Sequence, residues 1–383
     1  MQCSDESEPL LTLQERSDLI NAEFTPPFVS CDPKLLSVFV VAFDTRAGNV
    51  VEWKYPESYS LTGVEFKALP SGAHNVQHDV MIFELANNFG LAAYIMKQVD
   101  NTAERGARMK SVGVITSNYL ALCQHEERLV ELAHDSVEHP GAYEQLIQYF
   151  AEFNQGCSVP VSLEMKANSV GSMYDLFKSQ GVQIFTLWKM LLLKKRILLQ
   201  CTPPISRQCS YVICLAAICH SQFTQSNPLF YVTVNDMTTL NYKQSYIACS
   251  ADMILKTKGS QVYDVYVTGS AVVDPKGEMF PVTRGDIIRY NQLCGAVDKE
   301  YGKKNTSEVD RLIQGYFSVL TTDLFNTLTN LMTGSRGLQP DDLKDIRLHN
   351  SDLPYLQTLV DKLGYDVELF SPSCCEEHFS SLI

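Results

Sequence analysis

The chain is poor in positive charge and has no long uninterrupted apolar run. Its 383 residues carry 31 Lys and Arg against 44 Asp and Glu, which gives a formal net charge of −13. Proteins that bind nucleic acid neutralise phosphates with clustered Lys and Arg, so this composition argues against a nucleic-acid partner and against a generally polybasic membrane-surface protein. The most apolar stretch, residues 184–201, contains four cations, so no transmembrane segment is expected.

Signatures of metal, nucleotide or covalent chemistry are missing too. The twelve cysteines include no Cys-x-x-Cys pair, so they are interpreted as small buried thiols of a reducing compartment. We find no Gly-x-x-x-x-Gly-Lys-Ser/Thr loop, no Gly-x-Gly-x-x-Gly fingerprint and no Gly-x-Ser-x-Gly elbow. No metal and no cofactor are therefore expected. Because residues 1–9 are polar and acidic rather than basic and then apolar, we expect a cytoplasmic protein.

Apolar residues make up 45% of the chain, which is enough to form a packed core. Residues 1–33 are predicted to form a flexible acidic tail. Residues 34–156 begin with short β-branched and aromatic runs and end with helical patterns, which is typical of a compact α+β domain. The strands are expected at residues 37–43, 49–55, 79–85, 91–99 and 112–116, and the helices at residues 119–133 and 143–153.

After a Ser-, Pro- and Gly-containing linker at residues 157–171, the pattern changes. Ile184, Leu187, Trp188 and Leu191 have the spacing of a buried helical face. In residues 172–280 helical patterns alternate with short strands, which predicts a doubly wound α/β layer. The expected strands are residues 197–199, 229–234, 246–249 and 262–267, with a further helix at 211–219. Residues 281–383 are predicted to be helical at 284–301, 308–332 and 354–363.

One polar cluster is a candidate site. Arg105, Arg108 and Lys110 lie just before the predicted strand at residues 112–116. Three cations in one turn can contact a phosphate, since a guanidinium donates to two phosphate oxygens at once. The alternative is a solvated turn that flanks a strand, and the residues alone favour that interpretation.

Five motifs together resemble the DENN-domain family. The hairpin at residues 48–56 (GNVVEWKYP) is similar to the opening of the family's upstream lobe, and residues 187–199 (LWKMLLLKKRILL) to the helix-to-strand segment of the central module. Further similar segments are residues 63–67 (GVEFK), 104–113 (ERGARMKSVG) and 263–267 (YDVYV). The resemblance covers residues from about 35 to the C-terminus. It implies a longin-like N-terminal lobe, a central doubly wound α/β DENN lobe and a helical C-terminal part.

The resemblance also implies a function. DENN proteins act on Rab-type small GTPases in membrane traffic, mostly as guanine nucleotide exchange factors, without covalent chemistry or a cofactor. The implied location is the cytoplasm, with recruitment to vesicle or endosomal membranes. Peripheral association with a membrane is therefore compatible with the resemblance. Two alternatives remain. Arg105 could act as an arginine finger, as in folliculin-type relatives, and so make the chain a GTPase-activating protein. The chain could also be a non-catalytic scaffold or effector that binds a GTPase.

Overall fold

The computed structural model describes residues 34–101, 104–155, 171–219, 226–302, 306–333, 337–367 and 369. The predicted tail at residues 1–33 and, apart from Gly171, the predicted linker at 157–171 lie outside these residues. The described chain forms a mixed α/β structure built on one sheet of ten strands, in the order β10-β9-β6-β8-β7-β3-β4-β5-β1-β2.

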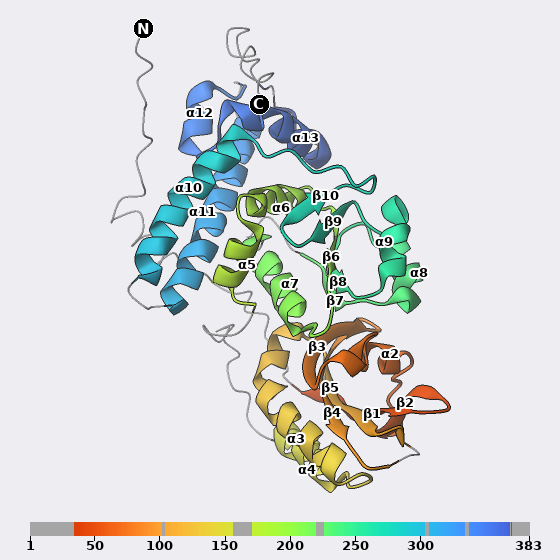
Figure 1. Cartoon of the computed structure of the whole chain (residues 1–383). Helices are drawn as coiled ribbons and strands as arrows, with labels where there is room; N and C mark the ends of the chain where they lie inside the picture. Colours follow the sequence, from red (N-terminus) through yellow and green to blue (C-terminus); the bar gives the residue numbers. More distant parts are fainter. Residues whose placement is uncertain are drawn as a thin grey trace.

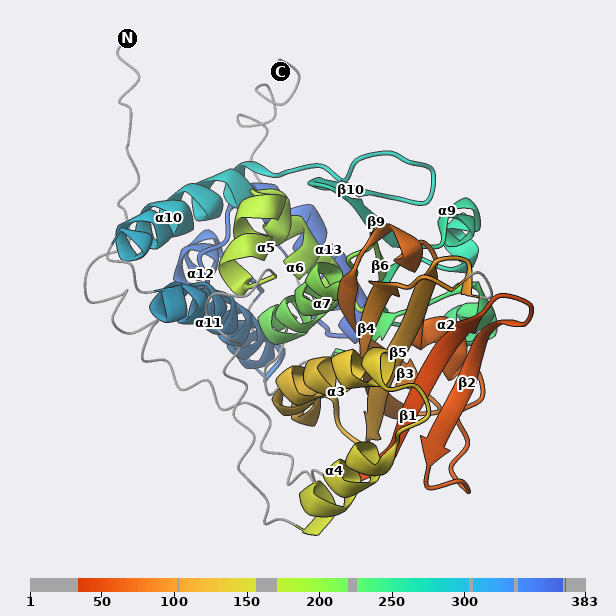
Figure 2. The same ribbon diagram turned by 60° about the horizontal axis from the view of Figure 1, so that its bottom comes forward.

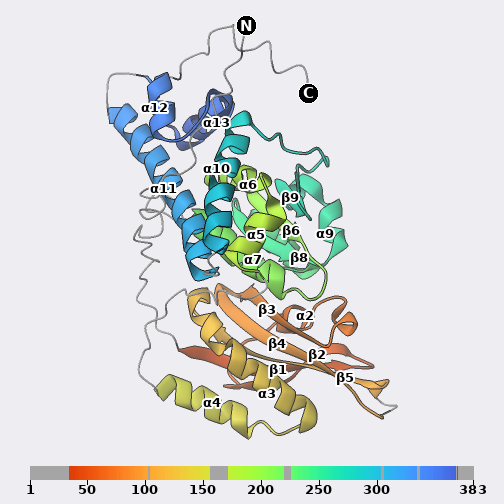
Figure 3. The same cartoon turned by 60° about the vertical axis from the view of Figure 1, so that its left-hand side comes forward.

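The first half of the sheet is antiparallel and forms the N-terminal lobe (Figure 3). Six consecutive residues of β4, from Gly90 to Ile95, are buried, because helices cover both faces of these strands. Helices α3 and α4 lie on one face and α2 on the other (Figure 2). The strands are β1 Leu35–Asp44, β2 Gly48–Tyr55, β3 His78–Leu85, β4 Asn88–Gln98 and β5 Ala107–Thr116, and the helices are α2 Val64–Ala68, η1 Ala73–Asn75, η3 Tyr119–His125, α3 Glu126–Glu138 and α4 Glu144–Gln155.

The second half of the sheet forms the central lobe, in which β9, β6, β8 and β7 run parallel. Helices α5, α6 and α7 lie on one face of these strands, and α8 and α9 on the other (Figure 1). The predicted stripe of Ile184, Leu187, Trp188 and Leu191 is buried in α6. The elements are α5 Met173–Gln180, α6 Gln183–Leu192, β6 Arg196–Gln200, α7 Ser206–Cys219, β7 Pro228–Tyr231, η4 Val234–Asp236, α8 Met237–Tyr242, β8 Tyr246–Ser250, α9 Met253–Thr257, η5 Gly259–Gln261, β9 Val265–Thr268 and β10 Ala271–Val273.

The C-terminal part is helical, as predicted, and packs outside α5, α6 and α7 (Figure 1). Among the residues described there, we find no helix long and apolar enough to cross a bilayer. The helices are α10 Arg284–Tyr301, α11 Thr306–Thr333, α12 Pro340–Asp345, η6 Asn350–Asp352 and α13 Leu353–Leu363.

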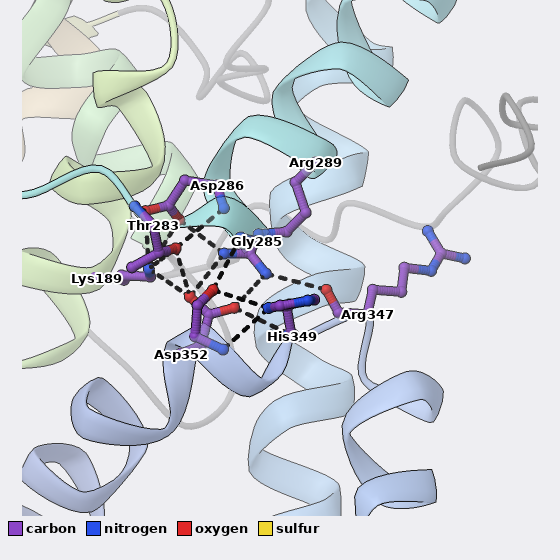
Figure 4. Close-up of polar contacts among 9 residues, drawn as sticks. Lys189, Thr283, Gly285, Asp286, Arg289, Arg347, His349 and Asp352 are labelled. Carbon is purple, nitrogen blue, oxygen red and sulfur yellow. Dashed lines mark hydrogen bonds and ion pairs between the residues drawn. The ribbon is translucent and has the colours of Figure 1, made fainter. Parts of the chain in front are cut away.

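A buried network of four charges, which we call the charged junction, joins these helices to the central lobe (Figure 4). Lys189 of α6 lies 2.8 Å from Asp286 and 2.7 Å from Asp352, and Arg289 lies 2.7 Å and 2.8 Å from the same two carboxylates. All four residues are at most 4% exposed. Two cations therefore balance two anions in the interior, where an unpaired charge is very costly.

Asp352 is the centre of the charged junction. It also accepts hydrogen bonds from the Thr283 hydroxyl and the His349 backbone N–H. Burial acts to raise the pKa of its carboxyl, but the hydrogen bond and charge of Arg289, together with Lys189, outweigh burial and hold the pKa well below its usual range. Gly285 allows this close approach, because a Cβ there would lie 2.4 Å from an Asp352 oxygen.

Several predicted boundaries were wrong. Strand β5 begins at Ala107 rather than at residue 112, because it pairs along the whole of β4, from Gln98↔Ala107 to Phe89↔Thr116. Arg108 and Lys110 consequently lie on a strand and not in a turn. The single helix expected at residues 119–133 is a 3₁₀ turn followed by α3, and the helix expected from 211 begins five residues earlier.

The two lobes also share one sheet, which the separate patterns did not predict. Strands β3 and β7 meet through the antiparallel pair Phe83↔Phe230. Nearby, buried Asp79 of β3 accepts hydrogen bonds from the backbone N–H groups of Ile205 and Ser206, at 2.6 Å and 3.1 Å. This carboxylate of one lobe thus caps the first turn of α7 in the other, which accounts for the earlier start of that helix.

Candidate functional site

A groove of about 690 Å3 lies where the N-terminal and central lobes meet, and we call it the interlobe groove. Its lining comes from both lobes and is mainly apolar, with a few polar groups. Pockets of this size that combine apolar walls with a few placed polar groups are typical binding sites.

The N-terminal wall is formed by the β1–β2 hairpin, the neighbouring strand β5 and the segment that begins with α2. It presents Phe43, Met109 and Phe66. The Asn49 side-chain amide donates to the carbonyl oxygens of Glu65 and Leu69, at 3.1 Å and 2.9 Å, and so fixes this segment on the hairpin. Phe66 is 44% exposed, whereas Val64, Lys67 and Ala68 of α2 are buried.

The central wall is formed by the loops that follow the parallel strands β7 and β8. Val234 follows β7, and Asp252 and Ile254 follow β8. The carboxyl ends of neighbouring parallel strands lie at one edge of a sheet, so the two loops meet there, and this edge is where α/β sheets usually bind ligands.

Polar contacts between the lobes hold the two walls together. The Ser71 hydroxyl donates to the Asp252 carboxylate at 3.0 Å, and the other oxygen of this carboxylate accepts from the Val234 N–H at 2.8 Å. Lys67 of α2, which is almost completely buried, pairs with Asp236 at 2.9 Å. The walls are therefore positioned before any partner binds, which lowers the entropic cost of binding.

The exposed apolar side chains of the groove are its main chemical feature. Phe43, Phe66, Val234 and Ile254 all line it and are all more than a third exposed. A rim of polar residues surrounds them, including His74 and Asn235. Apolar patches of this kind, edged by polar groups, mark protein interaction sites. The arrangement suits a folded partner that inserts apolar side chains between the lobes.

Arg105 lies just before the start of β5, beside the tip of the β1–β2 hairpin. It is exposed, has a left-handed backbone (φ 54°) and donates to the Thr45 carbonyl at 3.1 Å. Thr45 follows Phe43 in the β1–β2 hairpin, so the guanidinium is held beside a hairpin that lines the groove. Arg105 itself is not among the residues that line the groove.

The other two predicted contact residues have partners within the lobe. Arg108 pairs with Glu104 at 2.7 Å and donates to the Val137 carbonyl. Lys110 is buried and pairs with Glu52 at 2.6 Å, and the same carboxylate accepts from the Tyr143 hydroxyl. The structure does not bring the three cations to a common point, so a role for Arg108 and Lys110 at a phosphate requires these pairs to open.

The residues that line the groove were not predicted from the sequence. Phe66 belongs to one of the motifs that carried the family resemblance, but nothing in the pattern predicted its exposure. Ile254 and Asp252 follow a predicted strand, and their place after a parallel strand was the available signal. Across the described ranges, we find no group of three or more His, Cys, Asp or Glu side chains arranged to hold a metal ion.

Comparison with known proteins agrees with this two-lobed arrangement. The profile of the family described as DENN domain-containing protein 11 matches residues 38–276, which span both lobes. The DENN domain-containing protein 11 of Xenopus laevis is 32% identical over 402 residues, covering 92% of this chain and 89% of that protein. The proteins of the same name from Rattus norvegicus and Danio rerio are 30% and 29% identical and cover 90% and 89% of the chain, with 84% and 77% of their own lengths matched. The predicted membership is thus confirmed, and the chain belongs to the DENN domain-containing protein 11 family.

Proposed function

We propose that the chain is a guanine nucleotide exchange factor that promotes GDP release from a Rab-type small GTPase, which it binds in the interlobe groove. In this proposal residues 34–156 are the longin-like upstream lobe, residues 172–280 the central DENN lobe and residues 281–383 the downstream helical part. The protein acts in the cytoplasm and is recruited to vesicle or endosomal membranes. The observation that carries the proposal is the preformed apolar groove between two lobes of a DENN-family chain.

The mechanism follows from differential binding. An exchange factor accelerates GDP release only if it binds the nucleotide-free GTPase more tightly than the GDP-bound form. The apolar side chains of the groove supply contact area for the mobile surface loops of a GTPase, and the fixed walls favour the conformation that has released its nucleotide. No residue of the chain needs to form a covalent bond.

The test is release of a fluorescent GDP analogue from a panel of purified Rab proteins. We expect acceleration on at least one Rab, and a loss of at least about 30-fold in kcat/KM for Ile254→Asp, as for a central interface residue. Ile287→Asp is the matched control, since Ile287 is exposed to a similar degree on α10, outside the groove. No acceleration on any Rab, or equal losses in both variants, would contradict the proposal.

The exposed guanidinium of Arg105, held beside the β1–β2 hairpin, supports a second candidate, a GTPase-activating role in which it stabilises charge on the γ-phosphate. Under this alternative, Arg105→Ala lowers stimulated GTP hydrolysis about 1,000-fold. Arg46→Ala, in the neighbouring hairpin, serves as control. Under the exchange proposal, both substitutions leave GDP release unchanged. Preference for the GTP-bound form without any catalysis would instead identify a scaffold or effector.

A further inference from the structure

Lysines from four separate segments gather on one side of the central lobe of this acidic protein. They are Lys195 before β6, Lys256 and Lys258 at the end of α9, Lys276 in the turn after β10, and Lys362 in the last turn of α13. We call this surface the basic face. All of its lysines except half-buried Lys195 are exposed.

Contacts of the Arg196 side chain and of Gly259 bring the first three segments together. Arg196, next to Lys195, donates to the carbonyl oxygens of Ser260 and Gln261 at 2.7 Å and 3.1 Å, which places the start of β6 against the turn after α9. A Cβ added to Gly259 would lie 3.7 Å from Pro275, so the turn that carries Lys276 lies beside the same segment.

The end of α13 completes the basic face. Burial lowers the pKa of Lys362, and the charges of Lys195 and Lys194 lower it further. The carboxylate of Asp264 acts in the opposite direction, so both lysines and this carboxylate lie near the end of α13.

Two of the carboxylates next to these lysines, Asp264 and Asp274, are held by other groups. Asp264 pairs with Arg196 at 2.8 Å. Asp274 accepts the backbone N–H groups of Lys276 and Glu278, at 2.8 Å and 2.9 Å, and so stabilises its own turn. Within the described chain, neither Lys256, Lys258 nor Lys276 forms an ion pair, and the Lys256 ammonium lies over the Tyr266 ring at 5.4 Å. With Asp274 and the exposed Glu278, the turn that carries Lys276 has a net charge of −1, so the positive charge of the basic face comes from its other lysines.

Two exposed methionines lie in the same segments as the lysines. Met253 begins α9 and is 52% exposed, and Met279 follows the Lys276 turn and is 62% exposed. Apolar side chains among lysines are typical of surfaces that lie in the interface of an anionic bilayer, where lysines reach the headgroups and apolar groups enter the acyl boundary. An acidic peptide would use the lysines but would not require exposed methionines.

We propose that the basic face binds the surface of an anionic membrane, with the lysines at lipid headgroups and Met253 and Met279 in the interface. Ile254, the next residue of α9, lines the interlobe groove, so the membrane would lie beside the bound GTPase. The idea that the basic face presents a membrane-attached GTPase to the groove rests on the proposed function. The membrane contact itself does not rest on it.

The test is co-sedimentation of the full chain with vesicles of phosphatidylcholine containing about a third phosphatidylserine, without any GTPase. Each lysine near an anionic surface contributes roughly a fivefold increase in binding, so Lys256→Glu/Lys258→Glu is expected to lower the bound fraction at least about 20-fold. Lys299→Glu/Lys344→Glu makes the same change of charge on α10 and α12, which lie on the other side of the molecule from α9 (Figure 1), and is expected to bind normally.

Other measurements separate the contributions. Vesicles of phosphatidylcholine alone, or about 1 M salt, should abolish binding because the attraction is then absent or screened. Met253→Ser/Met279→Ser should weaken binding at unchanged charge. Absence of binding to the anionic vesicles, equal losses in both lysine variants, or binding of polyglutamate with no vesicle binding would overturn the proposal. Because no GTPase is present, none of these results depends on exchange activity.

Discussion

The two junctions of the central lobe are built in opposite ways. Toward the C-terminal helices, Lys189, Asp286, Arg289 and Asp352 form a closed junction in which both charges of each sign are paired and buried. Toward the N-terminal lobe, the interlobe groove leaves apolar side chains exposed and is bridged at its edge by a few polar contacts. The first junction fixes the position of the C-terminal helices, and the second has unused binding surface.

The difference shows how stability and binding can be separated in one chain. A buried ionic network gives little net stability but strongly penalises any arrangement that breaks it, so it defines one position for the helices. An exposed apolar groove costs little stability and leaves contact area for a partner. Substitutions should therefore affect folding at the charged junction and binding at the groove.

The largest effect is expected for Asp352→Ala, which leaves Lys189 and Arg289 buried without one of their two carboxylates. We expect the free energy of unfolding in urea to fall by about 3–5 kcal/mol. Asp298→Ala removes the same charge from the exposed pair with Lys178 and should cost less than about 1 kcal/mol. Equal effects in the two variants would remove the distinction between a buried and an exposed pair.

The pH dependence of stability provides the next test, because His125 of the N-terminal lobe and Asp352 of the charged junction should respond to acid in different pH ranges. Burial lowers the pKa of His125 to about 4, so the unfolded chain binds a proton there before the folded one does. The stability that comes from neutral His125 is present above about pH 6.5 and is lost as the pH falls toward 4, by about 2 kcal/mol between pH 7 and 5. His125→Gln should remove this loss in urea titrations and leave the opposite effect of Asp310, whose pKa burial raises to about 6 and whose protonation stabilises the folded chain as the pH falls.

Asp352 should not contribute to that loss of stability. Its folded pKa is depressed, so the stability it provides is present above its unfolded pKa of about 3.9 and is lost only in stronger acid. A loss of stability between pH 7 and 5 that persists in His125→Gln would show that a group other than His125 causes it.

A smaller effect is expected at the polar contact that bridges the groove. Asp252→Ala removes the acceptor of the Ser71 hydroxyl and the Val234 N–H and should lower the free energy of unfolding by about 1 kcal/mol. If this contact sets the spacing of the walls, the distance between spin labels on the two lobes should become broader in the variant. An unchanged distance distribution would show that the other contacts suffice.

The smallest effect on folding is expected for Phe66→Ala. Because Phe66 is 44% exposed, its removal should change the free energy of unfolding by less than about 0.5 kcal/mol. GDP release from the responsive Rab should nevertheless fall at least about tenfold. Phe83→Ala, which removes a fully buried ring of β3, is the contrasting variant and should destabilise by about 3–5 kcal/mol.

Sequence periodicity predicted the elements whose packing is local. The stripe of α6 has a clear helical period, the hairpin of β1 and β2 is marked by β-branched and aromatic runs around a turn, and the structure contains both. The start of β5 at Ala107 was not predictable, because a strand extends as far as its partner pairs with it and polar residues such as Arg108 give no local β signal. The same applies to α7, whose first turn is capped by Asp79 of a distant strand.

Among the candidate site residues, the sequence showed Arg105, Arg108 and Lys110 as one cluster, and the structure separates them. Their spacing does not reveal that Glu104 and Glu52 pair with two of them. The groove and the basic face could not be predicted from the sequence for a related reason. Each combines residues from segments more than a hundred positions apart, such as Phe66 with Ile254 and Lys195 with Lys362.

The sequence by itself determined the family of this protein, its mixed α/β class and its order of a strand-rich lobe, an alternating lobe and a helical end. These properties depend on local patterns of apolar residues and on short motifs. Only the tertiary structure decided that the lobes share one sheet, that a groove opens between them and that an acidic chain has a basic face. Those features depend on contacts between distant segments, and local sequence patterns do not indicate which distant segments come into contact.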